Sequence, residues 1–415
     1  MPASPSTARA INDRLALRLL QQEGPLTAGQ LKQLTGLSRP TVADLVERLT
    51  ASGLITVVGE SGEQRRGPNA RLYGIVAGRA HLAALDVRTE GVFVLVSDLV
   101  GRVLAEGSAP IGGDTGTGPA VEQAVTAVER TVKEALAAGA PPPEGVHAWG
   151  RLHTVGIGAP GLVDPATGDL RDSSGLPAWH RRLAAALQER LPEARVRVEN
   201  ETNLAALAEQ REGAARDRDT FVLLWLGHGV GAAVVLDGTL RRGASGGTGE
   251  IGFLPVPGTP ALPSATDCDG GFHSLAGAAA IARLAGEHGL PVDGPADGPG
   301  VAVVVRTAVA RATDPAGGPA GTSAERFLDA LAHRIAIGAA SVVSILDPGC
   351  VVLGGEIGQA GGAVLAERVA ERLRRMSPLA TEVRAGRLGG GAVLRGALLT
   401  ARDRAQDELF APADR

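Results

Sequence analysis

The sequence predicts an α/β protein in which a small winged helix-turn-helix module precedes a larger, two-lobed body. The chain has 415 residues, which is too many for one ordinary domain. Residues 30–55 read as two short helices joined by a glycine turn and followed by a strand. Beyond this module, strand-like runs and helical stretches alternate twice in the same order. We therefore expect domains at 1–76, 77–200 and 201–415, with the final helix able to return to the first lobe.

Composition narrows the class of protein. Hydrophobic residues make up 44% of the chain, yet no uninterrupted apolar run approaches the ~18 residues that a membrane span needs. The N-terminus has no charged-then-apolar secretory pattern, so a soluble, cytoplasmic protein is expected. Cys268 and Cys350 are the only cysteines, which excludes a disulfide framework and a cysteine-rich metal site.

Charge is distributed unevenly along the chain. Residues 1–76 hold nine Lys+Arg against six Asp+Glu, a net charge of +3, and the remainder carries −7. A basic module on an acidic body can present one face to the phosphates of a nucleic acid while the body is repelled. An excess of three is also ordinary for a protein surface, so charge alone does not decide the function of the module.

The first 35 residues predict two helices. Gly24 and Pro25 break the chain between them, and Thr27 is placed to cap the second helix, which we expect over 28–35. The apolar side of the first helix is expected to comprise Ile11, Leu15, Leu17, Leu19 and Leu20.

A third helix follows the tight turn that Gly36 permits. Ser38 stands where a helix N-cap belongs, Pro40 is tolerated in the first helical turn, and Gly53 ends the helix. The buried stripe of this helix is expected to consist of Val42, Leu45, Val46 and Leu49. Its first turn would then point outward.

The outward first turn is suited to reading DNA. In a helix-turn-helix, the second helix of the pair lies in the major groove with its N-terminal residues at base edges. Strands over 54–58 and 70–75 would form a β-hairpin wing whose basic tip lies beside the DNA backbone or in the minor groove. The predicted DNA-contacting residues are Ser38, Arg39, Thr41, Arg48, Arg65 and Arg66. A three-helix accessory domain that binds protein is the alternative.

The body begins with an antiparallel meander of three strands, expected at 81–87, 91–99 and 102–110. Helices and strands then alternate, with helices near 119–138 and 178–191 and strands at 152–157, 195–199, 220–226 and 230–236. Residues 291–300 and 313–322 look like flexible insertions. The apolar helix around 324–346 is expected to be core or dimer surface.

Four segments carry a resemblance to a known family. They are GIGAPGLVDPATGDL at 156–170, VENETNLAALAE at 198–209, LGHGVGAAVVLDGTLRRGASGGTGEIGF at 226–253 and PGCVVLGGEI at 348–357. In this order, behind a helix-turn-helix, they resemble the ROK family of repressors and sugar kinases. The resemblance covers nearly the whole chain. It implies an actin-like, sugar-kinase (ribonuclease H-like) body with a ligand site in the cleft between its lobes.

Each part of the kinase machinery that the resemblance implies is altered here. The family's first phosphate loop, Asp-x-Gly-Gly-Thr, corresponds to DVRTE at 86–90, which lacks the glycines and gains an acid. Glu201 stands in place of the family's catalytic Asp, and His228 replaces a hydroxyl residue in the second phosphate turn. A displacement of ~1 Å can reduce a rate ~100-fold. We therefore expect no catalytic residue and no enzyme.

The zinc site that the resemblance implies also lacks ligands. Phe253 stands where the family has a histidine, and Cys268 supplies one thiol in place of a cysteine cluster. A pair formed by Cys268 and His273 falls short of the four nitrogen or sulfur ligands of structural zinc. The sequence therefore predicts no metal and no cofactor.

Sugar-binding residues are better retained. By resemblance, Asn200, Glu201 and Glu250 bind sugar hydroxyls, a task that suits carboxylates because each accepts two hydroxyl protons. Glu250 can equally be a strand-end carboxylate bonded to backbone amides. Gly175 replaces a sugar-contacting asparagine of the family, so the pocket is expected to take an altered sugar or none. Trp179 is expected in the core rather than stacked on a sugar ring.

These features predict a sugar-responsive transcriptional regulator of carbohydrate-metabolism genes, most simply a repressor. Its expected partners are operator DNA, a sugar or sugar derivative, and a second copy of the chain in a homodimer or homotetramer, with no membrane. Sugar binding would close the lobes and move the paired winged helices out of register with the operator. Two alternatives stay open, namely an active ATP-dependent sugar kinase and a ligand-independent DNA-binding regulator with an empty cleft.

Overall fold

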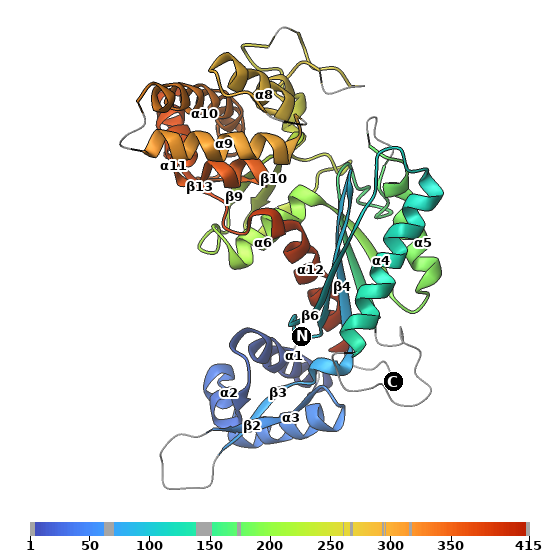
Figure 1. The fold of residues 1–415 in the computed structure, drawn as a ribbon. Helices are drawn as coiled ribbons and strands as arrows, with labels where there is room; N and C mark the ends of the chain where they lie inside the picture. Colours follow the sequence, from blue (N-terminus) through green and yellow to red (C-terminus); the bar gives the residue numbers. More distant parts are fainter. Residues whose placement is uncertain are drawn as a thin grey trace.

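The computed structural model describes residues 5–61, 70–137, 152–171, 176–259, 261–265, 269–292, 294, 296–314 and 318–411. Figure 1 shows a small N-terminal module below a larger body, and the body has two lobes, each built on a five-stranded sheet. The predicted fold class, a winged helix-turn-helix followed by a two-lobed α/β body, is confirmed.

The module contains three helices and a three-stranded sheet. The helices are α1 (Pro5–Glu23), α2 (Ala28–Thr35) and α3 (Arg39–Ala51), and the strands are β1 (Leu26–Thr27), β2 (Ile55–Ser61) and β3 (Ala70–Ile75). The strand order is β1-β3-β2, with both pairings antiparallel. The predicted hairpin of β2 and β3 is therefore present, with a short third strand from the turn before α2.

Local signals set the ends of α2 and α3. Thr27 and Gln30 form a reciprocal capping box at the start of α2, and Gly36 ends this helix in the left-handed conformation at φ 70°. The Ser38 hydroxyl caps α3 by accepting from the Thr41 amide. The predicted stripe of α3 is buried in full.

The expected apolar side of α1 is partly wrong. Ile11 and Leu15 are 58% and 39% exposed, whereas Leu17 and Leu20 are buried together with Ala16. The buried face of α1 therefore starts one turn later than the pattern of large apolar residues suggests.

The first lobe is a mixed sheet with the order β6-β5-β4-β7-β8. Its strands are β4 (His81–Arg88), β5 (Gly91–Asp98), β6 (Val103–Pro110), β7 (Leu152–Ala159) and β8 (Arg195–Asn200). Alternate residues of β4 enter two different cores. Ala83 and Leu85 pack with α4 (Thr117–Ala137) and α5 (Trp179–Arg190), whereas Leu82 and Ala84 face α12 (Ala392–Leu409). The strand is consequently apolar throughout, as expected for a strand buried on both faces.

The second lobe repeats this topology in the order β11-β10-β9-β12-β13. Its strands are β9 (Phe221–Leu226), β10 (Val230–Leu236), β11 (Thr239–Arg241), β12 (Cys350–Gly354) and β13 (Glu382–Ala385). Its helices are α7 (His273–Ala276), α8 (Ala278–Glu287), α9 (Gly298–Thr313), α10 (Gly318–Leu346) and α11 (Gly355–Met376). In each lobe an antiparallel meander is followed by two parallel strands.

The predicted insertions at 291–300 and 313–322 extend too far along the chain, because a helix begins inside each of them. Asp297 caps α9 by accepting from the Gly300 amide, and α10 begins at Gly318. The first turns of these helices are rich in glycine and proline, a composition typical of loops, although both residues are tolerated at the start of a helix. Among the described helices, α10 is apolar and long enough to cross a membrane, yet half of its most apolar window is buried inside the second lobe.

Two helices cross between the lobes. Helix α6 (Glu201–Glu212) follows the first sheet but packs on β9 and β10, and α12 follows the second sheet but packs on β4 and β7. They meet where Gly396 lies against the Leu204 backbone, since a Cβ at Gly396 would stand 2.0 Å from the Leu204 carbonyl oxygen. Arg395 on α12 also pairs with Glu212 on α6, with 2.7 Å between Nη2 and Oε1.

Candidate DNA-binding surface and interlobe cleft

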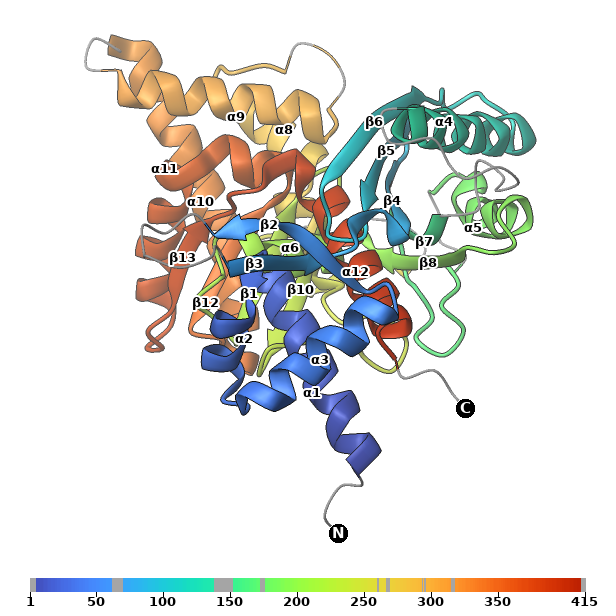
Figure 2. The same ribbon diagram turned by 90° about the horizontal axis from the view of Figure 1, so that it is seen from below.

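The start of α3 is exposed and lies on the side of the module away from the body (Figures 1 and 2). Arg39 is exposed there, and no ion pair or hydrogen bond of its side chain occurs within the described part of the chain. The hydroxyls of Ser38 and Thr41 lie 2.8 Å apart and belong to the helix cap. This turn therefore offers one cation on a rigidly capped helix end.

The structure gives Arg48 contacts inside the module. Its guanidinium pairs with Asp13 on α1, with 2.6 Å between Nη2 and Oδ1, and with Asp44 one turn earlier on α3. These contacts join α3 to α1, whereas the sequence prediction placed Arg48 at the DNA. Arg65 and Arg66 lie outside the described residues, between β2 and β3.

Asn200 lies at the junction of β8 and α6. Its side-chain oxygen accepts from the amides of Thr202 and Asn203, and its amide nitrogen donates to the Gly161 carbonyl at 3.0 Å. An asparagine amide has two N–H groups, so one stays available to a ligand. Asn200, which by family resemblance binds sugar, therefore also serves as the N-cap of α6.

Glu201 follows in the first turn of α6 and is partly buried. No hydrogen bond of its carboxyl group is found among the described residues. Burial, reinforced by the negative charges of Asp86 and Glu356, raises the pKa of Glu201 to about 8. Its carboxyl group is therefore mainly protonated at neutral pH and can donate a hydrogen bond to a ligand.

Glu250 is exposed beside η2 (Ile251–Phe253), and it contributes to the negative potential at Glu201. In the described part of the chain, no backbone amide donates to its side chain. The interpretation of Glu250 as a carboxylate bonded to backbone amides therefore gains no support. Asn200, Glu201 and Glu250 come from β8, α6 and the segment after β11, and the fold brings Glu250 near enough for its charge to act on Glu201.

The segment that resembles a phosphate loop is filled by an ion pair. Asp86 is buried at the end of β4, and Arg88 donates to its Oδ2 atom through Nε at 3.0 Å and Nη2 at 2.7 Å. Burial raises the pKa of Asp86, and the charge of Arg88 opposes that shift. Sequence reasoning recognised the lost glycines here but missed this pair.

In the segment that resembles the family's zinc site, two rings are in contact. Phe253 and His273 stack edge to face with centroids 5.3 Å apart, and His273 Nδ1 accepts from the Val230 amide at 3.4 Å. Burial lowers the pKa of His273. Cys268 lies outside the described residues, and the described residues contain no group of three or more potential metal ligands. Trp179 is 3% exposed, in agreement with the expected core position.

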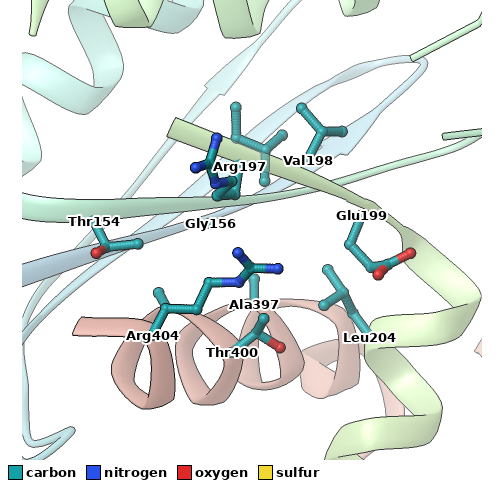
Figure 3. A pocket seen from close by; sticks show the side chains of 11 residues that line it. Thr154, Gly156, Arg197, Val198, Glu199, Leu204, Ala397, Thr400 and Arg404 are labelled. Carbon is teal, nitrogen blue, oxygen red and sulfur yellow. The ribbon is translucent and has the colours of Figure 1, made fainter. Parts of the chain in front are cut away.

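A small cavity of about 30 Å³ lies between β7, β8 and α12 (Figure 3). Its lining includes Gly156 and Glu199 from the sheet and Ala397 and Arg404 from α12. This volume suits one or two water molecules rather than a sugar. The cavity therefore marks imperfect packing beside the crossing helices and is separate from Glu201 and Glu250.

Helix α12 joins the body to the module. Gln406 donates through Nε2 to Gln21 Oε1 at 2.7 Å and to the Leu99 carbonyl at 2.9 Å, and Gln21 donates to the Val100 carbonyl at 3.2 Å. At the other end of α12, the buried Glu209 accepts from the amides of Arg387 and Leu388 in the loop before η3 (Gly389–Gly391). The sequence carried no signal for these contacts, because the partners lie far apart along the chain.

Comparison with known proteins agrees with this architecture. The profile of the ROK family matches residues 122–404, and that of the MarR family matches residues 11–67, which lie within the winged module. A solved ROK family transcriptional regulator, described as a homolog of the E. coli MLC protein, covers 97% of this chain and 98% of its own with a TM-score of 0.73. Its sequence identity is 20%, so this likeness concerns the fold.

Two sequence relatives differ in their described activity. The xylose repressor of Caldicellulosiruptor bescii is 24% identical over 60% of this chain and 59% of its own length. The glucokinase of Halalkalibacterium halodurans is 29% identical over 51% of this chain and 63% of its own length. The aligned part thus covers about three fifths of each relative. Since the ROK profile covers more than half of the sequence, the chain belongs to the ROK family.

Proposed function

We propose that this protein is a sugar-responsive transcriptional regulator, most simply a repressor, that binds operator DNA as a homodimer or homotetramer in the cytoplasm. The observation that carries the proposal is the continuous path from the cleft to the DNA-binding module. Helix α12 begins beside the loop whose Arg387 amide donates to Glu209. Near its end, Gln406 contacts Gln21 of α1. The MarR profile and the name of the xylose repressor support the same function.

The path provides a physical means of coupling. Helix α12 packs on the first sheet and crosses α6, which packs on the second sheet, so a change in the angle between the lobes must move one helix against the other. The module is joined to the far end of α12 through Gln406. Because paired recognition helices must lie about 34 Å apart or a multiple, a small rotation of each module would abolish simultaneous contact with both half-sites.

The cleft is better suited to binding than to phosphotransfer. A general base must accept the proton of the sugar hydroxyl, and Glu201 is mainly protonated at neutral pH because its pKa is raised to about 8. Arg88 pairs with Asp86 where the phosphate loop of a kinase would approach nucleotide. We therefore infer that Asn200, Glu201 and Glu250 bind an effector that is not phosphorylated by this protein.

A DNA selection tests the proposed function. Full-length protein is used to enrich fragments from a random DNA library, and the enriched sequence is measured in a gel-shift assay at fixed salt with xylose, glucose or N-acetylglucosamine. We expect a two-fold symmetric site whose affinity for the protein changes with one sugar. Failure to enrich any sequence over several rounds would argue against a regulator.

Sugar kinase activity is the second candidate, because the glucokinase relative is 29% identical and Asn200 is retained. Measuring ADP release with a panel of hexoses and N-acetylhexosamines distinguishes the two functions. Turnover above the ATP-only background would favour the kinase. The third candidate, a ligand-independent regulator, predicts a specific DNA site but no thermal stabilisation of the protein by any sugar in the panel.

A further inference from the structure

Arg88 makes contacts with both lobes. Within the first lobe it donates twice to Asp86, and its guanidinium carbon lies 4.6 Å above the ring centroid of Phe93 on β5. Outside the first sheet, Nη2 donates to the carbonyl oxygen of Gly390 at 3.1 Å, and Nη1 lies 3.9 Å from Oε1 of Glu356. Glu356 is in the first turn of α11, and Gly390 is in η3 directly before α12.

These contacts use the planar geometry of the guanidinium group. Its five N–H donors point outward in one plane, so one arginine can join acceptors that belong to separate elements. The Arg88 side chain is 24% exposed and that of Glu356 is 23% exposed, so both are partly withdrawn from solvent. A charge pair in this setting is screened less by salt than a fully exposed pair.

The surroundings of Arg88 are acidic. Asp86, Glu356 and Glu90 all act electrostatically on its guanidinium, and Glu201 lies close enough to sense Asp86, Arg88 and Glu356. An incoming phosphate would meet this negative charge, and the nearest cation is already engaged. The backbone that would accept phosphate also bears the Val87 and Arg88 side chains in place of the glycines of the family's loop.

We propose that Arg88 is a resident cation that joins the two lobes through Asp86, Glu356 and the Gly390 carbonyl, in the place where a kinase would hold nucleotide between them. The lobes are thereby held at a defined angle without nucleotide, and the cleft accepts an uncharged ligand. This inference goes beyond the proposed function, because it concerns the lobe angle of the free protein whether or not that protein binds DNA.

Distance measurements between the lobes test the proposal. Spin labels are placed at Lys133→Cys on α4 and Arg326→Cys on α10, both exposed, in a Cys268→Ser background. Cys350 is fully buried and needs no replacement. Pulsed electron paramagnetic resonance then gives the distribution of distances in buffer without sugar or nucleotide. We expect Arg88→Gln and Glu356→Gln each to broaden this distribution and to lengthen its mean.

Three further variants make the test specific. The double variant Arg88→Gln/Glu356→Gln should show no larger change than either single variant, because both remove the same bridge. Arg102→Gln, which breaks a pair with Asp98 on the same sheet but away from the cleft, should leave the distribution unchanged. Asp86→Asn/Arg88→Gln removes the buried carboxylate together with its cation, so no unpaired charge stays behind. This variant should still broaden the distance distribution.

The outcomes separate a bridge from a structural role. Unchanged distributions in Arg88→Gln and Glu356→Gln would overturn the proposal, as would additive changes in their double variant. If Asp86→Asn/Arg88→Gln keeps the wild-type distribution while Arg88→Gln alone broadens it, the effect arises from the unpaired Asp86, and the bridge is likewise refuted.

Discussion

Gln406 near the end of α12 donates a 2.7 Å hydrogen bond to Gln21 of α1, and thereby joins the last helix of the chain to the first. Both side chains also bond to backbone carbonyls of the segment after β5, at Leu99 and Val100. The contact lies within an apolar cluster that continues from α1 through β4 to α12. The module is therefore fixed to the body by packing together with a directed polar contact.

Removing this contact should loosen the module. In Gln406→Ala the Leu99 carbonyl loses its donor, and we expect a loss of about 1–3 kcal/mol in the free energy of unfolding. Backbone amides of α1 should also exchange faster with deuterium than in the wild type. Arg404→Ala is the matched control, since Arg404 is exposed on the same helix. Equal exchange in α1 for both variants would contradict the assigned role of Gln406.

Arg39 and Arg48 should respond differently to removal. Arg39→Ala removes an exposed cation at the start of α3, so we expect weaker DNA binding and a smaller salt dependence with an unchanged melting temperature. Arg48→Ala removes the pairs with Asp13 and Asp44, so the module should be destabilised. The expected loss is at most about 1 kcal/mol, because the side chains of both pairs are partly exposed to solvent. Gel shifts over a salt series and thermal melts of both variants make the comparison. If Arg48→Ala loses DNA binding without any change in stability, the result would support the sequence prediction that Arg48 contacts DNA.

The raised pKa of Glu201 predicts a specific pH dependence. In the unfolded chain this carboxyl group titrates near 4.5, and in the folded protein near 8, so the folded state binds the additional proton between these values. The contribution of Glu201 to stability therefore decreases as pH rises from about 5 to 8, by at most ~1.4 kcal/mol for each pH unit.

Comparison with Glu201→Gln isolates this contribution. The variant keeps the size of the side chain but cannot ionise, so its stability advantage over the wild type should grow across the same pH range. Urea unfolding of both proteins at several pH values measures the difference. A difference that is independent of pH would show that Glu201 titrates near its ordinary value.

The crossing of α6 and α12 should tolerate no side chain at Gly396. In Gly396→Ala the new Cβ would stand 2.0 Å from the Leu204 carbonyl oxygen, so the helices must separate, at a cost of about 1–3 kcal/mol. Gly391→Ala is the control, because a Cβ there meets nothing within 4 Å and the residue already has helical backbone angles. Urea unfolding should find Gly396→Ala the less stable of the two, and the reverse order would refute the close crossing.

Short-range patterns in the sequence determined the individual elements. Thr27, Gly36 and Ser38 set the ends of α2 and α3 because a cap or a left-handed turn depends on neighbouring residues. Strands of the body were predictable because their apolar runs are bounded by turn residues. The same short-range patterns failed at the starts of α9 and α10, where glycine and proline occur inside helices.

Only the tertiary structure decided which side chains meet. The bridge from Arg88 to Glu356 and the contact between Gln406 and Gln21 join residues that are hundreds of positions apart. The sequence likewise identified Asn200 and Glu201 through family resemblance, but the capping bonds of one and the raised pKa of the other depend on what the fold packs around them. Local sequence fixes backbone conformation, whereas burial and charge pairing arise from long-range contacts that a linear pattern does not contain.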